Sequence, residues 1–194
     1  MTISFMPRIA YLPIASLLLA GSLFATPREI QPCEPTAASS SWDFPSEASS
    51  LLMEVHGVAG QLKRDADRLE SLNRSKVSWE SHAQELNQVR EHINSSGELL
   101  ARLNQVRHVT LPWQQQAIDR INPLMKDLAT RTESAILHLN ENQTHLFAPD
   151  YQEHLSTISD RADELHDSVS TYLTLAETQQ KLERLQLKLE DAGV

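Results

Sequence analysis

Four long stretches of the chain place apolar side chains at alternating steps of three and four residues. This spacing puts the apolar side chains on one face of an α-helix. The first three stretches cover about residues 46–73, 76–108 and 111–142, and the last runs unbroken from Tyr151 to Ala176. The apolar positions are Leu52, Val55, Ala59, Leu62, Ala66 and Leu69; Trp79, Ala83, Leu86, Val89, Ile93, Leu100, Leu103 and Val106; Trp113, Ala117, Ile121, Leu124, Leu128, Ala135 and Leu139; and Tyr151, Leu155, Ile158, Ala162, Leu165, Val169, Tyr172 and Ala176.

This pattern predicts an all-α fold, an antiparallel up-down-up-down four-helix bundle over residues 46–190. The links between the stretches are only a few residues long, which forces neighbouring helices to run in opposite directions. Pro112 and Pro149 stand where the first turn of a helix tolerates a missing N–H. A mean step of 3.5 residues favours coiled-coil-like packing. Trp79 and Trp113 are expected in the core.

The last helix is predicted to be longer than its neighbours, with a short tail at residues 191–194. Its end carries Leu182, Leu185 and Leu189, which have no counterpart on the shorter helices. Two interpretations remain open: this end pairs with another chain, or it is a solvated end of the helix.

The first 25 residues are typical of a secretory signal peptide. Arg8 precedes an apolar stretch from Ile9 to Ala25. An uncleaved membrane anchor is the alternative, although the stretch is short for a membrane span. Residues 26–45 are rich in Pro, Ser and Thr and are predicted to be a disordered linker. We therefore expect a periplasmic or secreted protein with no membrane attachment beyond this segment.

Charge and cysteine content narrow the possible partners. Loss of the first 25 residues removes one of 17 basic residues, Arg8, and none of 26 acidic residues, which leaves a net charge of −10. Nucleic acid is excluded as an expected partner, because its binding needs a basic face. Cys33 is the only cysteine, so no disulfide within the chain is possible.

Several local strings are similar to those of a known family. They are WESH at 79–82, ELN at 85–87, REH at 90–92, PWQQQAIDR at 112–120 and HLNEN at 138–142. Across residues 45–190 the chain resembles a family of bacterial, predicted-secreted helical proteins with no assigned function. The resemblance implies a bacterial, exported protein and supplies no activity, ligand or catalytic residue.

Motifs for catalysis or cofactor binding are missing from the sequence. One Cys excludes covalent c-type haem, which needs Cys-x-x-Cys-His. The Glu-x-x-His pairs of di-iron bundles are missing, with Asp163 and His166 the nearest case. The sequence also lacks HExxH, P-loop and dinucleotide fingerprints. We predict a protein that is not an enzyme and carries no cofactor.

Histidines and carboxylates give a second hypothesis. If the turns lie near residues 74–75, 109–110 and 145–146, then His56, His92, Asp127 and His166 fall at one level of the bundle. Imidazole and carboxylate ligands suit Zn²⁺ or Cu²⁺. A second level collects Asp67, His82, His138 and Glu153 or His154. The alternative is that these side chains only flank the apolar faces and are solvated, as we expect for Gln114, Gln115, Gln116 and Arg120.

Two functions follow from these observations. The first is a non-enzymatic protein of the bacterial envelope that binds an unknown protein partner, or itself through the last helix. The alternative is a carrier of a small ligand or metal that uses the His/Asp layer within the bundle.

Overall fold

The described part of the chain is almost entirely helical. A computed structural model describes residues 44–74 and 77–191, and no strand occurs in these two segments. The helices are α1 (Phe44–Leu72), α2 (Trp79–Val106), the short 3₁₀ helix η1 (Arg107–Val109), α3 (Pro112–Glu141) and α4 (Pro149–Asp191). The predicted signal peptide, Cys33, residues 192–194 and all but the last two residues of the predicted linker lie outside the described segments.

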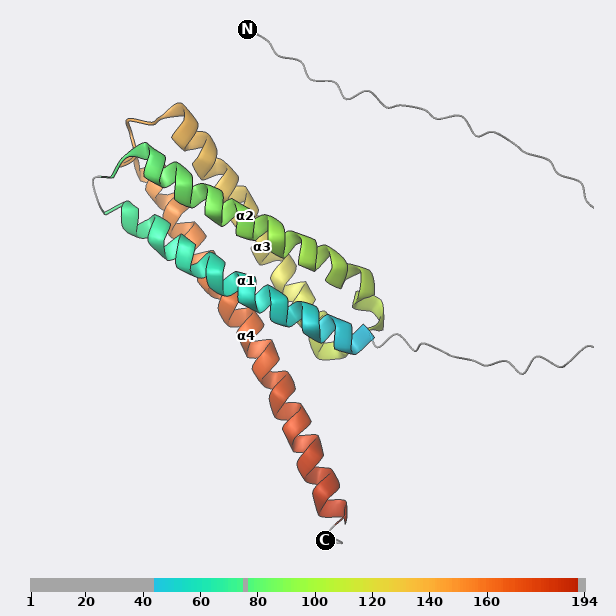
Figure 1. Ribbon diagram of the computed structural model, residues 1–194. Coiled ribbons are helices and arrows are strands. Elements are labelled where there is room, and N and C mark those ends of the chain that lie inside the picture. Colours follow the sequence, from blue (N-terminus) through green and yellow to red (C-terminus); the bar gives the residue numbers. More distant parts are fainter. Residues whose placement is uncertain (1–43, 75–76, 192–194) are drawn as a thin grey trace, which may run out of the picture. The chain divides into compact units, whose positions relative to one another are not determined.

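The four long helices form the predicted bundle. Consecutive helices reverse direction, and α1 packs on α2, α3 on α4, and α1 on α4 (Figure 1). The pair α2 and α3 is packed less closely than these three pairs. Helix α4 has 43 residues, against 29, 28 and 30 in α1, α2 and α3, which confirms that the last helix is longer.

The predicted apolar faces make up the core. All six predicted positions of α1 are at most 1 % exposed, and on α4 the positions from Tyr151 to Val169 are buried as well. The prediction for Trp79 is wrong, because this side chain is 37 % exposed at the first residue of α2. Trp113 is half-buried and packs against the core from the first turn of α3. Burial of these faces supplies the main favourable free energy of folding.

Proline and glutamine define where α3 begins. Pro112 and Pro149 are the first residues of α3 and α4, as predicted. At the start of α3 the side-chain Oε1 of Gln114 accepts a hydrogen bond from the backbone N–H of Leu111 at 2.9 Å. Gln114 therefore satisfies a donor that the helix itself leaves unpaired.

None of the helices in residues 44–74 and 77–191 is both long and apolar enough to span a membrane.

We expect Leu128→Ala to lower the free energy of unfolding by about 2–5 kcal/mol, because it leaves a cavity in a closely packed core. Leu128 is fully buried on α3. Urea denaturation followed by circular dichroism measures the change. Leu187→Ala is the matched control, because Leu187 is 60 % exposed on α4, and it should leave the unfolding midpoint nearly unchanged. Equal losses in the two variants would contradict the assignment of the core.

Candidate functional site

Two members of the predicted His/Asp layer come together. The rings of His56 on α1 and His166 on α4 are stacked, with centroids 4.9 Å apart and planes inclined by 28°. Burial lowers the pKa of His56, and the positive charge of a protonated His166 lowers it further. His56 is therefore favoured in its uncharged form. The pair supplies two imidazoles, where structural zinc sites use four protein ligands and catalytic ones three.

The other two members of that layer have different partners. Nε2 of His92 lies 2.9 Å from Oδ2 of Asp65, a carboxylate on α1 that is itself nearly buried. Asp127 on α3 accepts a hydrogen bond from Nε of Arg161 at 2.9 Å. Within residues 44–74 and 77–191 no three His, Cys, Asp or Glu side chains are grouped so that they could hold a metal ion. The four residues thus do not form one site.

The four residues do not meet because side chains of α1 and α2 pair at other positions along the bundle axis than predicted. His92 pairs with Asp65, nine residues further along α1 than His56. At 1.5 Å per residue, this is an offset of roughly 13 Å along the helix axis. In an antiparallel pair, an error of one residue in the centre of the turn displaces every predicted partner by two residues. A turn placed by sequence alone does not fix side-chain partners across the bundle.

The second predicted level is partly realised around a buried tyrosine. Nδ1 of His82 lies 3.1 Å from the hydroxyl of Tyr151, and both side chains are at most 1 % exposed. The ring of His138 stacks on Tyr151 with centroids 5.1 Å apart. Asp67 lies elsewhere and accepts a hydrogen bond from the hydroxyl of Ser159 at 3.0 Å. This cluster joins α2, α3 and α4.

Burial favours the uncharged forms of two members of this cluster, His82 and Tyr151. Burial lowers the pKa of His82 and raises the pKa of Tyr151 well above its ordinary value of 10.0. A neutral imidazole and a neutral phenol, both shielded from water, do not meet an external substrate. The cluster is suited to fixing the positions of the three helices.

A buried amide at the other end of the bundle was missed by sequence reasoning. Gln114, expected on a solvated face, is fully buried. Its Nε2 donates to the carbonyl of Pro45 at 2.7 Å and to the hydroxyl of Ser49 at 2.9 Å, both on α1. The signal was its position, because Gln114 falls three residues before Ala117 and seven before Ile121, on the apolar face of α3.

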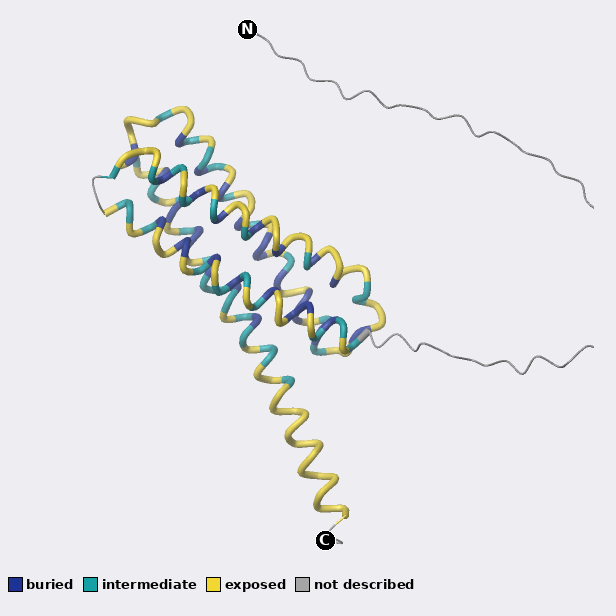
Figure 2. Tube along the Cα trace, viewed as in Figure 1, coloured by how far each residue is buried: buried dark blue, intermediate teal, exposed yellow. Residues whose placement is uncertain are grey.

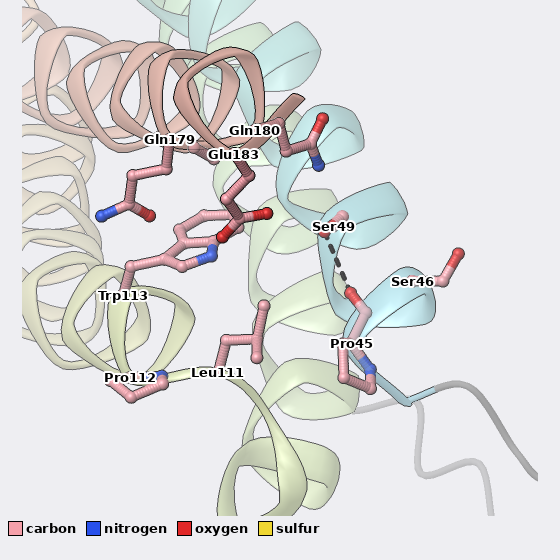
Figure 3. Close-up of a pocket in the computed structure, with 10 residues that line it drawn as sticks. Pro45, Ser46, Ser49, Leu111, Pro112, Trp113, Gln179, Gln180 and Glu183 are labelled. Carbon is pink, nitrogen blue, oxygen red and sulfur yellow. Dashed lines mark hydrogen bonds between the residues drawn. The ribbon is translucent and has the colours of Figure 1, made fainter. Parts of the chain in front are cut away.

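A shallow cavity of about 540 Å³ lies beside this amide, where α4 leaves the bundle. Figure 3 shows Gln179 and Glu183 reaching from α4 toward Trp113, with Leu111 below the indole. The wall on the α1 side comes from Pro45, whose carbonyl accepts the hydrogen bond of the Ser49 hydroxyl at 2.9 Å. The cavity is open to solvent, and it marks the base of the segment described next.

Residues 177–191 of α4, which we call the arm, are exposed along their whole length (Figure 2). The buried face of α4 ends at Val169, and the half-buried Tyr172 and Ala176 follow it. Leucines nevertheless continue. The exposed fractions are 42 % for Leu175, 57 % for Leu182, 51 % for Leu185, 60 % for Leu187 and 57 % for Leu189.

A groove follows the loosely packed pair α2 and α3. Three adjoining hollows line up along it and share residues such as Arg90, Ile93 and Ile136. Core residues come nearer to the surface here than on α1, with Ile93 7 % and Met125 6 % exposed. The described residues therefore form a groove between α2 and α3 in addition to the arm.

Comparisons with known proteins do not assign this chain to a family. A scan against protein-family models, a search of curated proteins and a search of solved structures returned no match. The resemblance to bacterial, predicted-secreted helical proteins stays a prediction.

We expect the stability of the bundle to fall as the pH drops below about 6.5. The pKa values of His82 and His56 are lowered in the folded chain, so the unfolded chain binds more protons in this range. Their contribution is complete above the unfolded pKa and is lost as the pH falls through the folded pKa. Urea unfolding at several pH values between about 8 and 5 measures this loss.

The matched comparison uses His82→Gln and His145→Gln. Because His82 is buried and His145 is exposed, His82→Gln should flatten the dependence of the unfolding free energy on pH, while His145→Gln should retain it. An unchanged slope in His82→Gln would show that the buried cluster does not govern the acid sensitivity.

Proposed function

We propose that this chain is an exported, non-enzymatic helical-bundle protein of the bacterial envelope whose arm binds another protein chain. The proposal rests on the leucines of the arm. Every leucine from Leu182 to Leu189 is more than half exposed. These side chains lie beyond the part of α4 that the other helices cover.

The bundle does not need the arm for its own core. The buried positions of α4 end at Val169, and the three other long helices bury their apolar faces against α4 before that point or against one another. From residue 177 to residue 191 every side chain is exposed. The apolar character of the arm is therefore not explained by folding of the bundle.

The free-energy cost of an exposed, isolated helix favours a partner bound to the arm. A helix of about 15 residues is only marginally stable in water without tertiary packing. Exposed apolar faces are typical of protein interaction sites. A partner that covers the leucines both removes them from water and holds the arm helical.

The compartment in this proposal rests on sequence. The apolar stretch from Ile9 to Ala25 after Arg8 supports export. The resemblance at residues 79–92, 112–120 and 138–142 supports a bacterial source. The acidic balance of the mature chain fits a protein partner better than nucleic acid.

The polar clusters support a role other than catalysis. The buried pair His82 and Tyr151 faces the interior, and His92 is held by Asp65. A metal carrier, the alternative function, has in the described residues only the stacked pair His56 and His166 to build on. We therefore favour the interaction role.

A photo-crosslinking amino acid at Leu185 should trap a discrete partner in living cells, because this side chain lies on the exposed arm. The same amino acid at Gln116, which is exposed on α3, is the control and should give no discrete product. Gel mobility followed by mass spectrometry of the crosslinked band identifies the partner. The same crosslinked band from both positions, or none from Leu185, would count against the arm as the binding site.

Removal of residues 177–191 should abolish the crosslinked complex and leave the bundle folded. The melting temperature should change by less than about 4 °C, the shift expected for a change of roughly 1 kcal/mol in a domain of this size. A large loss of stability would instead mean that the arm belongs to the core.

A further inference from the structure

Helix α4 carries two apolar faces that point in different directions. The first is the core face, which ends with Val169, Tyr172 and Ala176. At the positions where it would continue, the arm has Gln179, Glu183 and Gln186. The second, which we call the leucine face, consists of Leu175, Thr178, Leu182, Leu185 and Leu189.

The leucine face has the spacing of a coiled coil. Leu175, Leu182 and Leu189 are seven residues apart, and Leu185 follows Leu182 by three. In heptad notation, position a is occupied by Leu175, Leu182 and Leu189, and position d by Thr178 and Leu185. Leu187 falls at position f, outside this face, and nothing in the structure explains its exposure.

Charges beside the leucine face distinguish the two directions of pairing. Lys181 and Lys188 both occupy position g, and Gln179 and Gln186 occupy position e. In a parallel pair, g of one helix faces e of the other, so Lys181 meets an uncharged Gln186. In an antiparallel pair, g faces g, and lysines would oppose lysines. A parallel pair thus avoids the repulsion between lysines that an antiparallel pair would create.

The position of the bundle leaves room for such a pair. Each residue turns a helix by about 100°, so the leucine face lies roughly a third of a turn away from the core face that α1 and α3 cover. Two arms can therefore meet while each bundle stays on its own outer side. The bundle also holds the first turns of the arm helical through α4, which spares the arm the cost of helix nucleation.

We propose that the leucine face of α4 binds the same face of a second copy of this chain, as a parallel, in-register coiled coil. This inference rests on the proposed function and names the partner. The interface is symmetric, because the same residues contribute from both chains. Since the face spans only slightly more than two heptads, from Leu175 to Leu189, association should depend strongly on protein concentration.

Disulfide trapping tests the direction of pairing. In a Cys33→Ser background, Thr178→Cys places a thiol at position d and keeps every leucine. A disulfide needs closely spaced Cβ atoms. An in-register parallel pair places the two d positions opposite each other, whereas an antiparallel pair places d opposite a. We expect Thr178→Cys to form a covalent dimer under mild oxidation. Gln180→Cys, at position f on the outer side, is the control and should not.

Sedimentation of the full chain tests the interface at equilibrium. The unaltered chain should dimerise as its concentration rises, and Leu182→Glu should stay monomeric with the same melting temperature. A monomer at every concentration would overturn the inference. If a photo-crosslink from Leu185 to a different protein persisted in that case, the proposed function would stand and only the identity of the partner would be wrong.

Two further outcomes would also overturn it. Crosslinking between Thr178→Cys and Leu189→Cys chains, without self-crosslinking of either, indicates antiparallel arms, because position d faces position a in that arrangement. Crosslinking of Thr178→Cys to a thiol at Ala129→Cys indicates that the arm instead enters the groove between α2 and α3, which Ala129 lines.

Discussion

Mutual burial of four apolar helix faces is the constraint on which the rest of this structure depends. No helix of the bundle hides its own face, and each of the six predicted positions on α1 is removed from water only because α2 and α4 lie against it. The three closely packed pairs follow from this requirement. Where the pairing is looser, between α2 and α3, core residues such as Ile93 come closer to the surface.

Apolar burial is not directional, so it only weakly determines how far each helix is shifted along the bundle axis relative to its neighbours. Two buried polar contacts, one at each end of the bundle, fix this relative position because hydrogen bonds are directional. Gln114 connects the start of α3 to the start of α1, and His82 connects the start of α2 to Tyr151 at the start of α4. Each contact joins diagonal helices, and each would leave a buried polar group unpaired if the helices slid. These contacts favour one register over its neighbours.

Sequence periodicity was sufficient for the helices and insufficient for their partners. The steps of three and four residues locate the core positions, and Pro112 and Pro149 mark two helix starts to the residue. Residues that interrupt an apolar face were misjudged, because polarity suggested solvent for Gln114 while its position on the face led to burial. Trp79 was misjudged in the opposite sense, since it is the first residue of α2 and is 37 % exposed there.

The His/Asp layer failed for a related reason, whereas the greater length of the last helix was predicted correctly. A site built from His56, His92, Asp127 and His166 requires four helix heights to be correct at once, and His92 instead pairs with Asp65. The leucine face requires one helix only, because its spacing is internal to α4.

A property that repeats along a single helix can therefore be read from sequence with more security than one that spans several helices. The same reasoning explains why a symmetric partner is the economical one for the arm. Two copies of one periodic face match in register without any further information, whereas a different partner would have to evolve its own matching face.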